Sequence, residues 1–438
     1  MSSCSGRLPV IVMAAALAVA NAGWSWWGSG HIPRDLLEDP SQHSVYFEAD
    51  LPRVYRHVTD RGSNQDRSQL HPIFSLVTHT AYRLVRISGM EPLDCVRAVF
   101  AVAAGLYAGL AVLVGWVITR SVVMTGLIGA LSVAASASMF WWLVPETFNL
   151  GSITVLCALL AAGVWGDAPR RGVAATAAVT ALTASMSSSN AISGWALCFA
   201  RHRRVRIVLA LGMSFVMLFG VWLVQYGLFA QTKFFVPNVN ETRYTFRPES
   251  LGMVPRITGL VWSPVILPAL SLDSERYMRP PGRERSVITV QPGLPGSGSW
   301  AGLVAAMVWP VVAGLGLAGL VSGGRGFRAG WFGGVWRAVR SGRVAALFHA
   351  GRLRVLRAVA GISLAGQMVF HSVYGDETFL YSPHMIPMWL SVVGLGWHAP
   401  WGWARPVLLG LLPVLIASAA VNNGLLVVEL FGLLESRV

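Results

Sequence analysis

Charged side chains are scarce in this sequence. They make up 12% of the 438 residues, whereas hydrophobic residues make up 54%, and the mean hydropathy is +0.56. A soluble domain has about 25% charged residues, so this chain lacks the polar surface that a water-soluble protein of its size needs. Apolar runs of about 20 residues recur along it, long enough to cross a hydrocarbon core of about 30 Å. We therefore expect an all-α polytopic membrane protein whose partner is the lipid bilayer.

Lysine is nearly absent, since Lys233 is the only one, yet the net charge is +14. A basic balance can indicate nucleic-acid binding. Membrane proteins also keep basic residues in their cytoplasmic loops, however, where these residues set the topology. We therefore predict no nucleic-acid partner.

Cysteines are few and scattered, at Cys4, Cys95, Cys157 and Cys198. They form no CxxC pair, and no histidine stands near them at the spacing of a zinc site. We expect neither a disulfide framework nor a zinc centre. Tandem repeats are also lacking, and no inverted repeat of the kind that would favour a secondary transporter is visible.

The apolar runs predict about ten or eleven transmembrane helices in a single integral membrane domain, residues 1–438. The first is expected from Leu8 to Trp27, as an uncleaved anchor, although Ala20-Asn21-Ala22 also resembles a signal-peptidase site. Residues 172–200 are interrupted by Ser187–Asn190 and predict a hairpin of two short helices; one long helix is the competing interpretation. The remaining spans are expected at 96–118, 121–143, 147–165, 207–229, 299–322, 358–373, 384–398 and 405–430.

The polar segments between these runs predict the orientation. Segment 323–357 holds eight arginines and no acid, which is typical of a cytoplasmic loop. The N-terminus is then cytoplasmic too, and the chain is expected to be multi-pass in the plasma (inner) membrane. Two long polar segments, 28–95 and 230–298, become outer loops and carry most of the acids, which indicates a polar site on that face. Within the first, residues 70–87 predict an amphipathic helix on the membrane surface.

The most suggestive short motif is Glu48-Ala49-Asp50 in the first outer loop. Two carboxylates at this spacing can converge on one substrate, where a carboxylate serves as general base for an attacking hydroxyl. They can also hold a divalent cation, Mg²⁺ or Mn²⁺, against phosphate oxygens, with Asp50 as the metal ligand. The alternative is a pair of solvated loop acids.

Two further stretches place ionisable residues between apolar runs. Residues 370–384 gather two histidines, two tyrosines and two acids, including Tyr374, Asp376, Glu377 and His384. Ionisable residues at membrane depth are costly and tend to be functional, although an interfacial turn is the alternative. Glu146 stands in the tight turn 141–148, where it either faces a site or caps the next helix.

Arginines in the outer loops are not explained by the positive-inside rule. Guanidinium groups match phosphate bidentately, so a lipid phosphate is a suitable partner, whereas neutralisation of nearby acids is the alternative. The candidates for binding a donor phosphate are Arg53, Arg56, Arg243 and Arg247.

On these residues the chain resembles the membrane glycosyltransferases of the GT-C superfamily. These are many-span enzymes with an acidic motif and surface-lying helices in a large first outer loop. The matching features are Glu48-Ala49-Asp50, Gln69-Leu70-His71-Pro72, Pro145-Glu146-Thr147 and Tyr374-Gly375-Asp376-Glu377. The resemblance covers most of the chain in layout. Many members carry two adjacent acids or DxD where this chain has ExD, and some carry a large soluble C-terminal domain that it lacks.

The resemblance implies a mannosyltransferase-like enzyme that moves a sugar from a polyprenyl-phosphate donor to an acceptor at the outer face. Asp50, with Glu48, would be the base or metal-binding acid, and the outer arginines would hold the donor phosphate. The acceptor side or cavity would be lined by His71, Glu146, Tyr374, Asp376, Glu377 and His384. A transporter or flippase of a lipid-linked or anionic solute, a structural subunit and a non-catalytic relative are the alternatives. The sequence predicts no oligomeric state.

Overall fold

The computed structural model describes residues 7–42, 44–166, 172–234, 253–274, 286–290, 295–322, 353–374 and 378–436. In these ranges the chain is mostly helical, which confirms the predicted all-α class. Six helices are long and apolar enough to cross a bilayer by length and composition, as a multi-pass membrane protein requires. They are α1 (Arg7–Ser29), α5 (Pro92–Thr119), α8 (Thr147–Trp165), α11 (Arg204–Leu228), α13 (Trp300–Val321) and α17 (Ala404–Glu435).

The other predicted spans correspond to helices outside this group of six. The run 121–143 is divided at Ala135, whose extended backbone separates α6 (Val122–Ala134) from α7 (Ser136–Trp141). Residues 172–200 contain two helices that pack together, α9 (Val173–Met186) and α10 (Ala191–Arg201), joined by the 3₁₀ turn η4 (Ser188–Asn190). A single long helix there is therefore excluded. The predicted spans 358–373 and 384–398 correspond to α15 (Arg354–Val373), which has 20 residues, and to the shorter α16 (Ser382–Leu395).

Local sequence explains where several helices begin. Pro92 occupies the first turn of α5, where its missing N–H costs nothing. The hydroxyls of Ser121 and Ser299 cap α6 and α13, accepting hydrogen bonds from the backbone N–H of Met124 at 3.3 Å and of Gly302 at 2.9 Å. Such caps satisfy amide groups that a helix leaves unpaired at its start.

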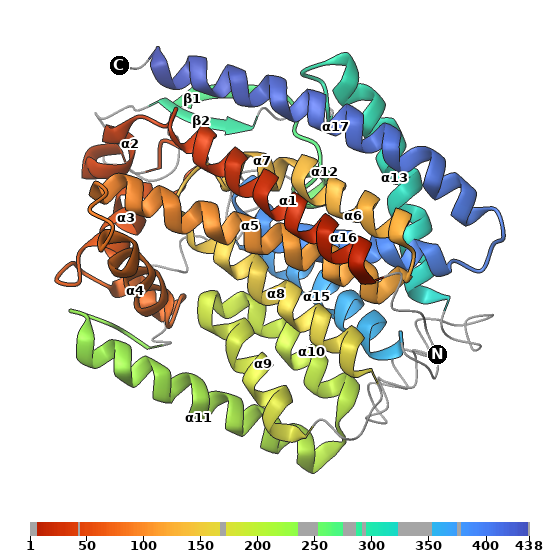
Figure 1. The fold of residues 1–438 in the computed structure, drawn as a ribbon, viewed down its shortest axis with the longest axis horizontal. Helices are drawn as coiled ribbons and strands as arrows, with labels where there is room; N and C mark the ends of the chain where they lie inside the picture. The colour runs from red at the N-terminus through yellow and green to blue at the C-terminus, as the bar shows by residue number, and fades with distance from the viewer. Residues whose placement is uncertain are drawn as a thin grey trace.

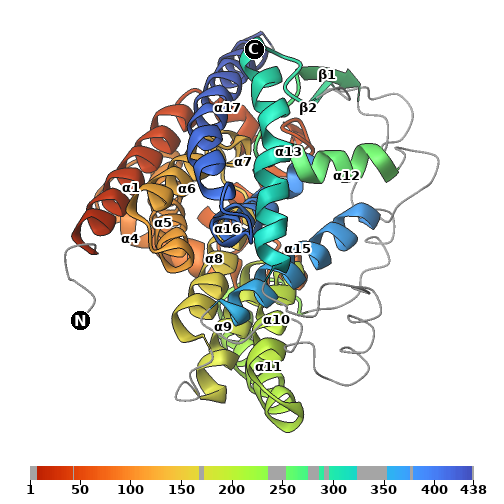
Figure 2. The same ribbon diagram turned by 90° about the vertical axis from the view of Figure 1, so that its right-hand side faces the viewer.

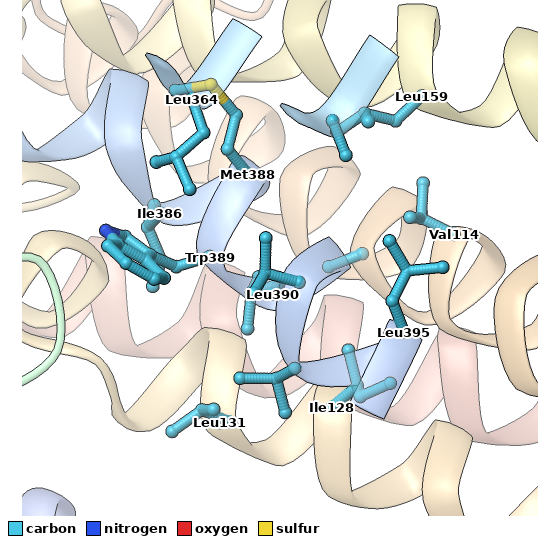
Figure 3. Packing of buried hydrophobic residues seen from close by; sticks show 14 of the residues in the cluster. Val114, Ile128, Leu131, Leu159, Leu364, Ile386, Met388, Trp389, Leu390 and Leu395 are labelled. Atoms are coloured by element: carbon cyan, nitrogen blue, oxygen red, sulfur yellow. The ribbon is translucent and has the colours of Figure 1, made fainter. Parts of the chain in front are cut away.

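Helix α16 forms the centre of the molecule. All of its residues are buried, and it contacts α5, α6, α8, α13 and α15. Figure 3 shows its Met388 and Leu390 among apolar side chains of those neighbours, such as Ile128 and Leu159. Helix α13 approaches so closely that a Cβ atom on Gly319 would lie 1.9 Å from the carbonyl oxygen of Leu395. Small residues that allow backbones to approach are typical of membrane helix packing.

Around this centre, α1 lies along α5, α17 lies along α13, and α9 packs between α8 and α11 (Figure 1). Figure 2 shows α1 and α12 (Met253–Trp262) on opposite sides of the bundle. The exposed residues of α11 are mostly apolar, as expected of a helix that faces lipid.

The polar segments 28–95 and 253–298 supply a group of small elements at one end of the molecule. Figure 1 places α2 (Arg34–Glu38), α3 (Leu51–Thr59) and α4 (Phe74–Arg86) there, together with the strands β1 (Leu270–Ser274) and β2 (Ser286–Val290). The N-terminal end of α1 lies toward the other end. Helix α4 corresponds to the amphipathic helix predicted over 70–87. The strands form an antiparallel pair in which Leu270 is opposite Val290, and nothing in the sequence pattern predicted them.

Hydrogen bonds join the two polar segments that were predicted as outer loops. The backbone N–H of Phe47 donates to the carbonyl of Ile288 at 2.9 Å, and the N–H of Ile288 donates to Val45 at 2.8 Å. Beyond α11, the N–H of Lys233 donates to the hydroxyl of Ser68 at 2.7 Å. Stretches far apart in the sequence therefore form one continuous surface layer.

A buried segment without regular structure, residues 263–267, crosses beneath this layer. Its carbonyl groups at Val265 and Leu267 accept hydrogen bonds from the side chains of Asn423 at 2.9 Å and Asn422 at 3.0 Å. The N–H of Ser136 donates to Val265 at 3.1 Å. Irregular backbone inside a membrane protein needs such partners, because no water is there to replace them. The two asparagines of α17 thus hold this segment.

Candidate functional site

The Glu48–Asp50 motif forms a tight turn that we call the acid turn, residues Tyr46–Asp50. The N–H of Ala49 donates to the carbonyl of Tyr46 at 2.8 Å. The two residues between them, Phe47 and Glu48, have φ angles of 46° and 60°, as the central residues of a type I′ turn do. Neither residue is glycine, so the left-handed conformation is strained at both, and strain of this kind tends to persist at functional sites.

Aromatic side chains hold the acid turn in place. The Tyr46 hydroxyl donates to the carbonyl of Phe140 at 2.7 Å, and the Phe47 ring lies edge-on to Phe379 at 5.0 Å. The indole N–H of Trp141 then donates to the carbonyl of Phe379 at 3.1 Å. Three predicted stretches, 46–50, 141–148 and 370–384, therefore meet around these buried rings.

The Asp50 carboxylate precedes α3 and is partly exposed. One of its oxygens lies 2.9 Å from Nε of Arg53, one turn along α3, and Arg53 also lies 3.9 Å from Asp66. Glu48 is exposed. Arg56 is exposed as well, with its Nε 3.3 Å from the carbonyl of Pro52 in its own helix. Of the two described arginines predicted to bind phosphate, Arg53 therefore sits beside the acids and Arg56 faces outward.

A short 3₁₀ helix, η3 (Asp66–Gln69), connects this surface to the interior. Asp66 faces Arg53, whereas the next residue, Arg67, lies 3.9 Å from the carboxylate of Glu146. These residues form a line of alternating charge that we call the charge chain: Asp50, Arg53, Asp66, Arg67 and Glu146. The charge chain begins at the partly exposed Asp50 and ends at Glu146, whose side chain is fully buried.

Glu146 also caps α8. Its Oε1 accepts hydrogen bonds from the N–H of Thr147 at 2.8 Å and from the Thr147 hydroxyl at 2.7 Å. A carboxylate at a helix N-terminus is stabilised by the helix dipole. The second oxygen, Oε2, is buried and has no hydrogen-bond partner within the described ranges. Glu146 therefore has both predicted roles: it caps α8, and it faces Arg67 of the charge chain.

Two buried histidines flank the charge chain outside the membrane-spanning segments. His71 pairs through Nδ1 with the carbonyl of Met186 at 2.6 Å and places Nε2 3.3 Å from the Thr147 hydroxyl. Burial lowers the pKa of His71 well below its usual value, and the charge of Arg67 acts in the same direction. Burial likewise lowers the pKa of His57 to about 4. Both imidazoles are therefore neutral at pH 7.

Deeper in the molecule, four buried polar side chains meet between α8, α10, α15 and α16. We call them the interior polar cluster: Asn190, Gln367, His371 and His384. The amide nitrogen Nε2 of Gln367 donates to Oδ1 of Asn190 at 3.0 Å, and the two imidazole rings lie 5.9 Å apart. Phe148, two residues after Glu146, stands edge-on to both His71 and His384. This ring therefore lies between His71, which flanks the charge chain, and His384 of the interior polar cluster.

The structure thus brings together Asp50, Arg53, His71, Glu146 and His384 from the predicted site. Tyr374 lies at the end of α15, where its ring stacks on Phe370 at 5.2 Å and lies 6.4 Å from Tyr381. Four predicted residues lie outside the described residues: Arg243, Arg247, Asp376 and Glu377.

The sequence interpretation did not assign Asn190 or Gln367 to a site, and it included Arg67 and Arg256 only in the set of outer-loop arginines suited to a lipid phosphate. Asn190 was treated as a helix break, and Gln367 is a single amide within an apolar run. Arg256 on α12 is fully buried, although it was predicted only as a member of an outer arginine set. The available signal was a strongly polar side chain inside an otherwise apolar helix, which is rare unless it is functional.

The predicted divalent cation at Asp50 can be compared with the donor atoms around it. In the described ranges, no group of three or more His, Cys, Asp or Glu side chains is arranged to hold a metal ion. Among the described residues, the guanidinium of Arg53 lies 2.9 Å from the Asp50 carboxylate. It competes with a metal ion for that carboxylate and cannot itself be a metal ligand. These residues do not form a metal site, so the Mg²⁺ or Mn²⁺ stays a prediction.

Comparison with known proteins identifies no relative: no family model matches the chain, and neither the curated proteins nor the solved structures contain a significant match.

Proposed function

We propose that the protein is a GT-C-like membrane glycosyltransferase that moves a sugar from a polyprenyl-phosphate donor to an acceptor at the extracytoplasmic face. The observation that supports this proposal is the convergence of the acid turn with Glu146 through the charge chain. Stretches separated by about a hundred residues supply a carboxylate at the surface, guanidinium groups beside it and a buried polar interior. A carboxylate that can act as a base and guanidinium groups that can bind phosphate suit an enzyme acting on a phosphate-linked sugar.

In the proposed reaction Asp50 acts as general base. Its carboxylate takes the proton of the acceptor hydroxyl as the hydroxyl oxygen attacks the anomeric carbon of the donor sugar. The bond between that carbon and the phosphate oxygen breaks, and its electron pair leaves with the polyprenyl phosphate. Arginines of the outer layer stabilise the negative charge of that leaving group. Arg53 would serve here among the described residues, with Arg243 and Arg247 as further candidates.

The proposed location is the plasma membrane, with the N-terminus cytoplasmic and both long polar segments outside. The arginine-rich segment 323–357 supports this orientation by the positive-inside rule. The gathering of α2, α3, α4 and the two strands at the end opposite the N-terminus is consistent with it (Figure 1).

The test is glycosyl transfer by purified protein with a lipid-linked donor, comparing Asp50→Asn with Asp60→Asn. Loss of a general base is expected to lower transfer by about 10²–10⁴-fold. Asp60 is an exposed acid of the same loop whose Oδ1 accepts the N–H of Gly62 at 2.8 Å, an interaction that Asn preserves. Asp60→Asn should therefore keep wild-type activity. Transfer by Asp50→Asn at the rate of Asp60→Asn would refute the assignment.

The second candidate is a transporter or flippase of a lipid-linked or anionic solute. The observation that favours it is the break between α9 and α10, where Asn190 contributes to buried polar groups between helices. Uptake of a lipid-linked sugar analogue by sealed proteoliposomes distinguishes the two candidates. A transporter would equilibrate the analogue across the bilayer, whereas the enzyme would consume donor only when acceptor is present.

A further inference from the structure

The interior polar cluster contains hydrogen-bonding groups that the protein leaves unused. Each of its four side chains is at most 1% exposed. In the described part of the chain six of their atoms have no hydrogen-bond partner: Nδ2 of Asn190, Oε1 of Gln367 and both ring nitrogens of His371 and His384. Buried polar atoms are normally paired, because an unpaired group loses its hydrogen bonds to water and gains none in return. Such a concentration at one place points to a ligand.

The arrangement of the cluster is fixed by its neighbours. Gln367 is bound to Asn190 and to the carbonyl of Ser189, both at 3.0 Å. The His371 ring stacks on Tyr381 at 4.0 Å, and the His384 ring meets the edge of Phe148 at 4.9 Å. The rings are therefore held in place while their nitrogen atoms stay without partners.

The balance of donors and acceptors identifies the kind of ligand. A neutral imidazole has one donor and one acceptor nitrogen. With the Asn190 amide as donor and the Gln367 oxygen as acceptor, the cluster offers donors at three atoms and acceptors at three. A phosphate or carboxylate only accepts hydrogen bonds and an ammonium group only donates them, so either would leave half of these atoms unpaired. A hydroxyl group does both, and vicinal hydroxyls suit a mixed set best.

The charges of the surrounding residues also favour a neutral ligand. Among the described residues, no Asp, Glu, Lys or Arg side chain forms a hydrogen bond or ion pair with the cluster. Among these described residues a charged ligand would be buried without a counter-charge, which is strongly unfavourable. A neutral polyhydroxy compound avoids that cost.

We infer that the interior polar cluster is a subsite that binds the hydroxyl groups of a neutral sugar. Under the proposed function, on which this assignment of the sugar rests, that ring belongs to the lipid-linked donor or to the acceptor. Its phosphate stays at the arginines of the outer layer. The arginines of the outer layer then bind the charged phosphate of the ligand, and the interior polar cluster binds its neutral sugar.

Gly151 on α8 packs directly against this subsite. A Cβ atom at this position would lie 2.8 Å from Nδ2 of Asn190 and 2.8 Å from Nε2 of His384. These are two of the six unpaired atoms, so a side chain here would displace groups that we assign to ligand binding. Gly314 on α13 provides a matched control, because a Cβ atom there meets nothing within 4 Å.

The test uses the full chain in lipid nanodiscs and measures binding by thermal unfolding and equilibrium dialysis. The probes are methyl α-mannoside, methyl α-glucoside and methyl β-galactoside, with inorganic phosphate as the charged probe. At least one glycoside should bind saturably and raise the melting temperature, and phosphate should not compete with it. Gly151→Ala should lower the affinity for that glycoside about tenfold or more, whereas Gly314→Ala should leave it unchanged.

A second variant guards against a purely structural effect of Gly151→Ala. His384→Phe keeps an aromatic ring against Phe148 but removes two unpaired nitrogens. It should raise the melting temperature of the ligand-free protein and abolish the stabilisation by glycoside. A residue needed only for folding would lower the melting temperature instead.

Two results would overturn the inference. One is the absence of saturable binding for all three glycosides, which would leave water as the occupant. The other is equal affinity in Gly151→Ala and Gly314→Ala. The proposed function and the subsite can fail separately. Glycoside binding that depends on Gly151, without any glycosyl transfer, would reject the enzyme and support the subsite. Glycosyl transfer that depends on Asp50, without Gly151-dependent glycoside binding, would support the enzyme and reject the subsite.

Discussion

The charge chain and the interior polar cluster place polar side chains in opposite ways. In the charge chain every member has a partner of opposite charge within 4 Å, and its outer members are partly exposed. The interior polar cluster is neutral and almost completely buried, and it contains six polar atoms without partners in the described ranges. The charges of the charge chain are therefore paired within the protein, although Oε2 of Glu146 lacks a hydrogen bond, whereas the hydrogen-bonding groups of the interior polar cluster are mostly unused in the described ranges.

This difference follows from the cost of burying each kind of group. An isolated charge inside a membrane protein is so unfavourable that it is paired or absent, whereas a neutral amide or imidazole can be left unpaired at a smaller cost. The protein therefore keeps its ionised groups where solvent or a counter-ion reaches them. Its unused hydrogen-bonding capacity lies inside, where a neutral ligand can satisfy it.

The largest effect on stability is expected at the inner end of the charge chain. Glu146→Ala removes a buried carboxylate that lies 3.9 Å from Arg67 and caps α8, so the free energy of unfolding should fall by about 3–5 kcal/mol. Glu91→Ala removes a partner of Arg34 whose side chain is 71% exposed and should cost no more than about 1 kcal/mol. Denaturation of the purified variants measures both. Equal costs would show that Glu146 is not held by a buried pair.

The neutral histidine beside the charge chain predicts a pH dependence. The pKa of His57 falls from 6.5 to about 4 on folding, so the unfolded chain binds a proton that the folded chain does not. The resulting stability is fully present above about pH 6.5 and is lost as the pH falls toward 4. It amounts to at most about 3 kcal/mol, because one pKa unit corresponds to about 1.4 kcal/mol.

Unfolding measured at pH 7 and at pH 4.5 for wild type and His57→Gln tests this dependence. The wild type should lose more stability than the variant over this interval, because only the wild type has an imidazole to protonate at this position. Identical losses would mean that His57 is as easily protonated in the folded protein as in the unfolded chain.

The strain in the acid turn predicts a small effect of the opposite sign. Glu48 has a φ angle of 60°, which glycine adopts without penalty, so Glu48→Gly should stabilise the protein by about 1 kcal/mol. Glu91, at a φ angle of −59°, is the control, and Glu91→Gly should not stabilise. A loss of stability in Glu48→Gly would argue against a strained turn.

Much of the fold could be predicted because membrane helices leave a strong signal. Runs of apolar residues predicted each long helix to within a few residues, and Ser187–Asn190 predicted the break between α9 and α10. The division of 121–143 at Ala135 was missed, because the residues on both sides are equally apolar and the break depends on packing against residues 263–267. The strand pair was missed since its short segments pair only with each other and with the acid turn.

The site was predictable only in part, for a related reason. Single acids and histidines stand out in an apolar chain, so Asp50, Glu146, His71 and His384 were all singled out. Their connection depends on η3, where Asp66 faces outward and Arg67 inward. Sequence alone gives no rule for the direction of two neighbouring side chains in an irregular loop. The amides of Asn190 and Gln367 become meaningful only when the structure places them together.

The central claim is that the acid turn and the buried glutamate belong to one site. A double-mutant cycle in kcat/KM for Asp50→Asn and Glu146→Gln tests it most directly, with a lipid-linked sugar as donor. Residues that act as a unit give non-additive effects. We predict that the double variant is less impaired than the product of the two single losses by at least about tenfold. Losses that multiply fully would show that the two carboxylates act independently and would contradict this account.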